Sequence, residues 1–408
     1  MYFPFLILLM FLKPHDGFMG DIYCWMDWSI FNVENGISNI YKHPTANYLP
    51  LSQYILYFFG KYQGSVENII NNIFSIKNIA LAFELGTTLL LFKLLEEKFK
   101  NYYKALFLSL FYFLNLGVLY NALIWGQIDG IMVFFIFGSI FFMLKKRIFL
   151  SMLFFLFAVN TKLQAIIFLP ILILMILPII TERSELKKFL LALLSVTLVQ
   201  FIIILPFIIA GDFKALTKVV FGSVDHYAVV SMNAFNMWHI LLDTNPIKTP
   251  DSIEFLGISY KNWGLLLFFI FSFFALFHFL KPIYNKFFKK VNTDISQKKI
   301  IISCALIPLI FFFFNTQMHE RYSQPVLIFL AAYAMLYKKP VPFILGSIAC
   351  FLNMEKVLQF FKTNNYHTLV FTPWFIACIY LLVIVLLFID LYDIKLIKKN
   401  LKVSSQTQ

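Results

Sequence analysis

Long apolar segments recur along the chain and are separated by short polar turns. A helix needs about 20 apolar residues to cross the hydrocarbon core of a bilayer, or fewer where flanking residues snorkel. This pattern predicts an all-α, polytopic membrane bundle of about 12 transmembrane helices, in a single domain over 1–408. The expected spans are 1–12, 73–92, 105–120, 131–144, 148–160, 165–180, 189–210, 263–280, 300–314, 325–337, 341–352 and 373–392.

The first apolar segment, 1–12, is short for a membrane span. It would form about 18 Å of helix at 1.5 Å per residue. We expect either that the chain begins upstream or that this helix enters the bilayer only in part. No small-residue cleavage site follows it, so it is not interpreted as a removable signal peptide.

Composition agrees with a membrane protein, because 60% of the residues are apolar and 13% are charged. The net charge of +13 does not indicate a nucleic-acid partner, since most basic residues cluster in short loops between apolar segments. By the positive-inside rule those loops are cytoplasmic. They lie at 98–104, 145–147, 183–188, 281–299, 338–339 and after 393.

This alternation predicts that both termini are cytoplasmic and that the long polar segments 13–72 and 211–262 face outward. Segment 49–60 must then lie in the interface without crossing the bilayer. The abundance of Lys, Asn, Ile and Phe suggests a bacterial source, which would place the outer face in the periplasm or at the exterior.

Several well-known sites are absent from the sequence. It contains no GxGxxG, P-loop, GxSxG or HExxH motif, and its four cysteines show no CxxC or zinc-binding spacing. A cytoplasmic nucleotide-sugar enzyme is therefore not expected. No motif predicts a cofactor, and although a divalent metal is compatible with the chemistry, nothing in the sequence supports one.

The first outer segment contains KPHDGFMGDIYCWMDW. Asp16 and Asp21 follow the first helix, and Asp21, Trp25 and Trp28 recur at a spacing that puts them on one helix face. Asp16 and Trp25 are candidate substrate contacts. A carboxylate near an acceptor and a helix N-cap followed by an aromatic belt are the two interpretations. Tyr48, in the next polar stretch, either stacks on a sugar or lies at the lipid headgroups.

Two later turns carry polar residues at the predicted outer ends of helices. The turn NALIWGQIDG places Trp125, Gln127 and Asp129 together, and NTKLQ places Lys162 and Gln164 at another helix end. These residues suit substrate binding, with Lys162 near a phosphate. Snorkelling toward the headgroups is the alternative fate of Lys162.

The segment SMNAFNMW contributes Asn233, Asn236 and Trp238, amides and an aromatic ring that suit sugar hydroxyls. An interfacial helix is the structural alternative.

The segment NTQMHERY is the most distinctive, because His319, Glu320 and Arg321 follow a strongly apolar helix. The chain has three arginines, and Arg321 is the one predicted on the outer face. Its planar guanidinium matches phosphate oxygens in a two-pronged contact. An ion pair with Glu320 or another carboxylate is the competing interpretation.

Lys77 and Glu84 lie within a predicted span, seven residues apart on one helix face. Charged groups in a bilayer are expensive and face a cavity or a partner. We expect both side chains to be cavity-facing.

Taken in order, these motifs resemble the GT-C glycosyltransferase superfamily. The residues that carry the resemblance are GDIYCWMDW, IY…NYLPL, WGQID, TKLQ, NAFNMW and MHERY. They resemble most closely the bacterial membrane proteins related to the second mannosyltransferase of GPI-anchor synthesis. A more distant resemblance is to the glucosyltransferases that extend a lipid-linked oligosaccharide.

The resemblance implies an enzyme that moves a hexose, with mannose expected, from a polyprenyl-phosphate donor to an acceptor hydroxyl on the outer face. It implies that Asp21 is the catalytic base and that His319 and Arg321 lie near the donor phosphate. Asn47 and Leu49 depart from the family pattern, which removes any acid role at position 47 and leaves Asp21 in place.

General chemistry agrees with that assignment. Nucleotide sugars are not available outside the membrane, so a donor there should be lipid-linked. Lys162, His319 and Arg321 could stabilise a departing phosphate, and a carboxylate could act as general base in one displacement with inversion. The acceptor could be a glycan, a lipid or a protein. A lipid-linked glycan flippase or transporter, and a glycan polymerase or ligase, are the alternative functions.

Overall fold

The computed structural model describes residues 2–222, 227–291 and 294–394, and these residues form an all-α fold. Apart from isolated bridges, the β structure in these ranges is one hairpin, formed by β1 (Glu254–Phe255) and β2 (Ile258–Ser259). Leu256 and Gly257 form its turn at φ 54° and 76°, as tight hairpins require. The predicted fold class is confirmed for the described part of the chain.

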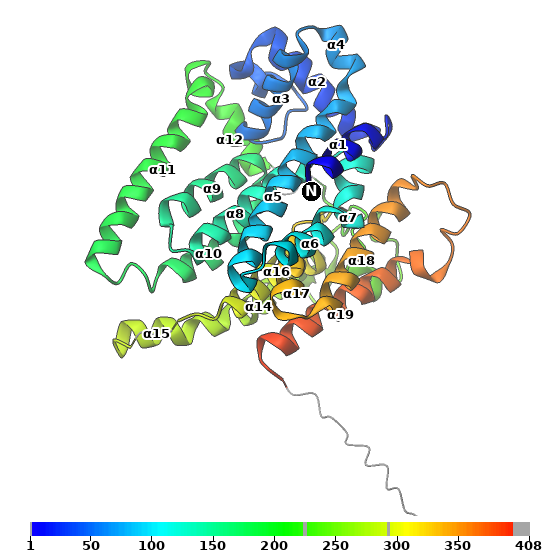
Figure 1. Ribbon diagram of the computed structural model, residues 1–408. Helices are drawn as coiled ribbons and strands as arrows, with labels where there is room; N and C mark the ends of the chain where they lie inside the picture. Colours follow the sequence, from blue (N-terminus) through cyan, green and yellow to red (C-terminus); the bar gives the residue numbers. More distant parts are fainter. Residues whose placement is uncertain (1, 223–226, 292–293, 395–408) are drawn as a thin grey trace, which may run out of the picture.

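The helices are labelled in chain order (Figure 1). The α-helices are α1 (Tyr2–Leu12), α2 (Met19–Asn35), α3 (Pro50–Gln63), α4 (Val66–Asn71), α5 (Ile76–Phe99), α6 (Tyr102–Phe113), α7 (Leu116–Leu119), α8 (Asp129–Leu144), α9 (Ile148–Thr161), α10 (Leu169–Ile176), α11 (Arg183–Ile209), α12 (Phe213–Gly222), α13 (Trp238–Leu241), α14 (Tyr260–Leu276), α15 (Leu280–Phe288), α16 (Gln297–Phe314), α17 (Val326–Tyr337), α18 (Pro340–Leu358) and α19 (Pro373–Leu391). The 3₁₀-helices are η1 (Ile37–Lys42), η2 (Ile73–Ser75), η4 (Leu163–Phe168), η5 (Phe277–Phe279) and η6 (Leu369–Phe371). The remaining short element, η3 (Tyr120–Trp125), is a π-helix.

Six of the described helical runs are long and apolar enough to cross a membrane. They are Ile73–Phe99, Arg183–Ile209, Tyr260–Phe288, Gln297–Phe314, Pro340–Leu358 and Pro373–Leu391. The pair Tyr102–Phe113 and Leu116–Trp125 meets the same criteria as one span bent by 49°. Each run overlaps a segment predicted from the sequence, so the chain is an integral membrane protein.

The remaining predicted segments form shorter apolar helices. Helix α9 has 14 residues, and at 1.5 Å per residue it spans about 21 Å, less than the ~30 Å hydrocarbon core. Helices α8, α9 and α17 are short because each starts or stops at a polar turn. Irregular backbone at membrane depth is tolerated where protein surrounds it. Gln127 and Asp129, at one of these turns, are indeed buried.

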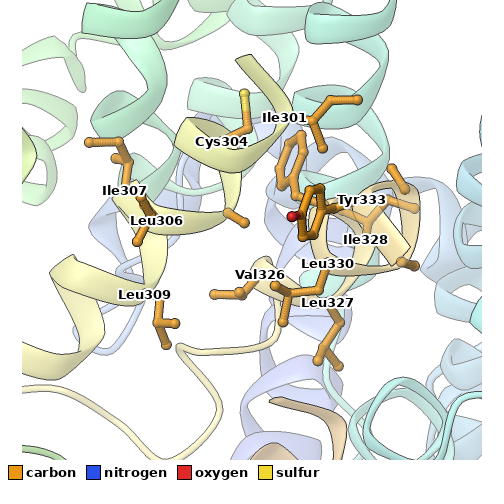
Figure 2. Packing of buried hydrophobic residues seen from close by; sticks show 14 of the residues in the cluster. Ile301, Cys304, Leu306, Ile307, Leu309, Val326, Leu327, Ile328, Leu330 and Tyr333 are labelled. Atoms are coloured by element: carbon orange, nitrogen blue, oxygen red, sulfur yellow. The ribbon is translucent and has the colours of Figure 1, made fainter. Parts of the chain in front are cut away.

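Helices α16 and α17 form the centre of the larger hydrophobic cluster. Figure 2 shows Cys304 and Leu309 of α16 near Val326 and Tyr333 of α17, and all four are buried. Nearly every residue of α17 is buried, as expected for a helix that is apolar all round. The segment 315–325, which carries the HERY residues, joins these two helices, so the most tightly enclosed part of the fold holds it in place.

The first outer segment packs into a second hydrophobic cluster. Helices α2, α3 and α4 gather at the end of the molecule opposite α15 (Figure 1). Trp25 and Trp28 are 1% and 2% exposed in this cluster, so they are core residues and the expected aromatic belt at the headgroups is wrong. Segment 49–60 falls in α3, which is not among the helices long and apolar enough to span. Its interfacial position stays a prediction.

Membrane orientation is testable with single cysteines in a cysteine-free background. We expect an impermeant thiol reagent to label, in intact cells, single cysteines placed at exposed positions next to the predicted outer turns at Gln127, Lys162 and Arg321. The same reagent should label Lys146→Cys and Lys289→Cys only after lysis. Both lysines are exposed in the structure, so burial cannot explain protection. Labelling of Lys146→Cys in intact cells would reverse the orientation. The basic tail beyond 394 and Met1 lie outside the described residues, so the cytoplasmic placement of the termini stays a prediction.

Candidate active site

The polar turns predicted on the outer face meet in one cluster. Asp21 lies in the first turn of α2, Gln127 follows η3, Asp129 begins α8, and Lys162 follows α9. Arg321 comes from the segment between α16 and α17. Four segments that are far apart in sequence, with Gln127 and Asp129 on the same turn, therefore contribute to one site.

The turn after η3 owes its shape to Gly126. This residue has φ 87°, a conformation that side-chain-bearing residues rarely adopt, and a Cβ there would lie 2.6 Å from Ile22 Cδ1. The backbone N–H groups of Gly126 and Gln127 both donate to the Asn121 carbonyl, at 3.1 and 3.0 Å. The reversed chain directs the side chains of Trp125 and Gln127 toward α2.

Asp21 receives those two side chains. Its Oδ2 accepts hydrogen bonds from Trp125 Nε1, at 3.0 Å, and from Gln127 Nε2. Arg321 Nη2 lies 3.8 Å from the same oxygen. No described residue hydrogen-bonds to Oδ1, and the side chain is 20% exposed. The carboxylate is thus oriented through one oxygen while the other remains accessible.

The helix-capping interpretation of Asp21 is wrong. The N-cap of α2 is Phe18, with no side-chain capping bond, and Asp21 lies within the first turn. Its negative charge still suits the positive end of the helix dipole.

Asp129 and Lys162 form a buried ion pair, with Nζ 2.7 Å from Oδ1. The Lys162 amine also lies 4.4 Å from the centre of the Tyr322 ring. Burial alone lowers the pKa of Lys162, but the Asp129 carboxylate outweighs it and holds the pKa above its ordinary value. Lys162 is therefore held in an ion pair inside the protein and is not a lysine snorkelling toward the headgroups.

Arg321 is paired with Glu320, through Nη1 and Oε1 at 2.6 Å. Its Nε lies 3.9 Å from Asp129 Oδ2. Burial disfavours the guanidinium charge, yet Asp21 and Glu320 keep the pKa of Arg321 well above its ordinary value. The predicted competing ion pair with Glu320 is thus present, and phosphate binding by Arg321 stays a prediction.

His319 joins this cluster to the second outer segment. Its backbone forms β-bridges with Met232 and Asn233. Its ring lies 5.1 Å from the Tyr227 ring and 5.0 Å from the Tyr322 ring, and its Nδ1 is 3.9 Å from Glu320 Oε2. His319 therefore lies beside the charged cluster, and its role near the donor phosphate stays a prediction.

An aromatic wall borders the cluster. Tyr48 packs against Trp25 and Trp28, with ring centres 5.0 and 5.6 Å apart. Burial raises the pKa of the Tyr48 phenol, although Lys162 and Arg321 act in the opposite direction. Tyr48 therefore belongs to the aromatic residues around Trp25, and its contact with a substrate stays a prediction.

Lys77 and Glu84 are both buried, but with separate partners. The Lys77 amine donates to the carbonyls of Pro14 and Asp16 at 2.9 and 2.6 Å. Glu84 accepts from Tyr112 OH at 2.7 Å and from Gln324 Nε2 at 3.0 Å. Both charges therefore face protein, and the cavity expected beside them stays a prediction.

Asp16 lies outside the charged cluster. Its side chain is exposed and accepts from the Gly17 N–H at 2.7 Å. Its position as a substrate contact stays a prediction.

The amide groups predicted to bind hydroxyls are partly used by the protein. Asn236 Nδ2 donates to the carbonyls of Phe312 and Asn315, and Trp238 Nε1 donates to that of Phe314. These bonds attach the second outer segment to the end of α16. Gln164 donates to the Tyr322 carbonyl at 3.3 Å. Asn236, Trp238 and Gln164 thus hold the backbone around the site in place. By contrast, no described residue hydrogen-bonds to the side-chain amide of Asn233.

Three residues of the site were not singled out from the sequence: Asn121, Tyr322 and Gln324. Asn121 Nδ2 lies 3.4 Å from Asp129 Oδ2, and Tyr322 covers Lys162. Two of them lie inside the motifs already noted, NALIWGQIDG and NTQMHERY, so the signal was present. Their roles depend on partners elsewhere in the chain.

The site contains buried polar atoms with no hydrogen-bond partner among the described residues. They are Asn121 Oδ1, Gln127 Oε1, Arg321 Nε and Gln324 Oε1. Such atoms are rare in folded proteins unless a ligand or water satisfies them. The described residues contain no group of three or more His, Cys, Asp or Glu arranged to hold a metal ion.

Residues 84–223 match the family model described as ALG3 protein. The matched stretch carries the turns with Gln127, Asp129 and Lys162, and it covers less than half of the chain. The ALG3 family consists of membrane enzymes that use a lipid-linked mannose donor. The similarity indicates a membrane mannosyltransferase. No curated protein sequence matches the chain significantly.

Glu84 supports the site through Gly130, the residue after Asp129. A Cβ at Gly130 would lie 2.6 Å from Glu84 Oε1. We expect Gly130→Ala to shift the start of α8, destabilise the protein by about 1–3 kcal/mol as overpacking does, and slow sugar transfer. Gly222→Ala is the matched control, because a Cβ there meets open space. Equal thermal midpoints and transfer rates for the two variants would contradict this supporting role.

Proposed function

We propose that the chain transfers a hexose, with mannose expected, from a polyprenyl-phosphate donor to an acceptor hydroxyl on the outer face of the membrane, with inversion. The observation that carries the proposal is the Asp21 carboxylate. It is oriented through Oδ2 by Trp125 and Gln127, it has an accessible second oxygen, and it lies beside the Arg321 guanidinium. A carboxylate with one oriented oxygen and one accessible oxygen has the geometry that a general base requires.

In the proposed reaction, Asp21 Oδ1 accepts the proton of the acceptor hydroxyl as that oxygen attacks the anomeric carbon of the donor sugar. The bond from that carbon to the phosphate oxygen breaks, and the phosphate leaves with the electron pair. Attack opposite the leaving group inverts the configuration. A positioned general base contributes about 10²–10⁴ to such rates.

The departing phosphate needs positive groups that are already in place. Lys162 has N–H donors beyond the one directed at Asp129, and Arg321 Nε, although 3.9 Å from Asp129 Oδ2, has no hydrogen-bond partner among the described residues. His319 lies beside them. The cluster has three carboxylates, of Asp21, Asp129 and Glu320, and two cationic side chains, Lys162 and Arg321. A phosphate therefore has to compete with the carboxylates for the N–H donors of these two cations. We therefore expect donor affinity to depend steeply on Arg321.

The finer assignment is also a proposal. We infer that the chain is related to the bacterial proteins that resemble the second GPI-anchor mannosyltransferase, with its site on the periplasmic or exterior face and both termini cytoplasmic. Its partners are then the polyprenyl-phosphate sugar, a glycan, lipid or protein acceptor, and membrane lipids, with no nucleic acid. Asp21, Asp129, Lys162 and Arg321 gather in one cluster at the ends of helices, which favours an enzyme over a flippase with charges along a central path.

Purified protein incubated with radiolabelled polyprenyl-phosphate mannose and glucose, and with a panel of acceptors, tests the proposal. We expect transfer of one sugar with inverted anomeric configuration, measured by NMR of the product. Movement of the intact lipid-linked sugar across proteoliposomes without transfer would indicate a flippase. Products many sugars long would indicate a polymerase. Repeating the assay after chelation tests for a metal requirement.

A further inference from the structure

A cavity on the predicted outer side is bordered by the segment 233–247, the end of α18 and the start of α19. Its volume is about 570 Å³, within the range of small-molecule sites. Asn233, His239, Asn245 and Lys356 supply polar groups, and Phe235 and Ile247 are among the apolar walls. None of the residues that line it carries a carboxylate or a guanidinium.

The polar groups of this cavity suit a ligand with many hydroxyls. No described residue hydrogen-bonds to the side-chain amide of Asn233 or to Asn245 Nδ2, and His239 Nδ1 is buried without a partner among the described residues. Burial lowers the pKa of His239 to about 4. Its ring is therefore neutral at physiological pH and offers one donor and one acceptor, the combination that a hydroxyl requires.

The cavity is weakly charged. Lys356 supplies the one cationic side chain among the lining residues, and its amine already donates to the Tyr366 carbonyl at 2.7 Å. The strong cations of the protein, Lys162 and Arg321, lie in the active site. A phosphate is therefore better held there, and this cavity is better suited to a neutral ligand.

The rim of the cavity is held rigidly beside the active site. Asn233 has φ 67°, a conformation uncommon outside glycine, and its carbonyl accepts from Asn353 Nδ2 at 2.8 Å. Asn353 Oδ1 accepts from the Phe235 N–H at 2.9 Å. Asn233 also forms a β-bridge with His319, and bridge partners have Cα atoms about 4.5–5.5 Å apart. One side of Asn233 thus faces the cavity residues and the other faces the charged cluster.

We propose that this cavity binds the neutral glycan part of the acceptor. A sugar chain seated between His239 and Asn245 would pass Asn233 and present its terminal hydroxyl toward Asp21, while the donor phosphate occupies the Arg321 side of His319. The proposal rests on the proposed function for the role of the ligand, but the binding itself can be measured without transfer.

The binding test uses saturation-transfer NMR with linear mannotriose and maltotriose as probes on the purified full-length protein. We expect at least one of them to bind, and we expect Ile247→Trp, which fills the cavity, to weaken binding by at least about tenfold. Ile253→Trp is the matched control, because Ile253 is an exposed isoleucine of the same outer segment outside the cavity lining. His239→Ala provides a smaller change in case the larger side chain disturbs folding.

The outcomes separate the two proposals. Failure of both trisaccharides to bind, displacement of a bound trisaccharide by inorganic phosphate, or equal binding by Ile247→Trp and wild type would overturn the cavity assignment. In the transfer assay we expect Ile247→Trp to raise the KM for the acceptor by at least about tenfold and to leave the donor KM unchanged. A different result would separate the two proposals. If the protein binds a trisaccharide, Ile247→Trp abolishes that binding and no sugar is transferred, the cavity assignment stands and the transferase proposal is refuted.

Discussion

The Asp21→Asn variant is expected to insert and fold normally but to transfer sugar at least about 10²-fold more slowly at saturating donor, the lower end of the loss for a general base. The amide keeps an oxygen that can accept from Trp125 Nε1 and Gln127 Nε2, so both bonds that orient the side chain are retained. What is lost is the basic second oxygen and the negative charge beside Arg321.

Asp27 provides the matched control for this measurement. It is on the same helix, its side chain is 56% exposed, and it pairs with His43 at 3.2 Å. Asp27→Asn should therefore retain nearly full activity. Sugar transfer by each purified variant, together with its thermal midpoint, distinguishes the cases. If Asp21→Asn turned over like wild type, Asp21 would not be the base, and Asp16 or Asp129 would be the next residue to test.

The Arg321→Lys variant is expected to remain folded but to bind the donor about 10–100-fold more weakly. Lysine keeps the positive charge beside Glu320 and Asp21 but loses the planar array of donors, a change that costs about 1–3 kcal/mol of charged hydrogen bonding. The measurement is donor KM, or direct donor binding, together with thermal stability.

Arg321→Ala should behave differently, because it leaves Asp21, Asp129 and Glu320 facing Lys162 alone. Removing one partner of a buried ion pair costs about 3–5 kcal/mol, so this variant should be strongly destabilised. Arg183→Lys, at an exposed arginine of a predicted cytoplasmic loop, controls for a general effect of the substitution. Unchanged donor binding in a folded Arg321→Lys protein would leave only the structural ion pair with Glu320.

Much of the active site could be anticipated because its residue types are unusual for their surroundings. Arg321, Lys162 and Asp129 stand out as charges at the ends of apolar helices, where desolvation makes an unpaired charge costly. The same reasoning could not tell which oppositely charged groups would pair. Lys162 binds Asp129 across 33 residues of sequence, and no local pattern encodes that contact.

Other residues were recognised by type but serve another purpose. Asn236 and Trp238 have the chemistry of sugar-binding residues, yet both donate to backbone carbonyls at the end of α16. Trp25 and Trp28 have the spacing of an interfacial belt, yet both are buried in a hydrophobic cluster that also contains residues of α3, α4 and η1. In each case the side chain was correctly placed on a helix or turn, and the neighbour that decides its role lies in another segment.

The sequence by itself determined the membrane helices and the polar turns between them, because hydrophobic length and charge clustering are local properties of the chain. Tertiary structure decided which turns meet, and therefore which groups are oriented and which remain available. Asp21 accepts hydrogen bonds from Trp125 and Gln127, which lie 104 and 106 residues further along the chain. Its orientation exists only once α2 packs on the turn at Gly126, because a hydrogen bond of about 3 Å requires both segments to be held in place by the core around them.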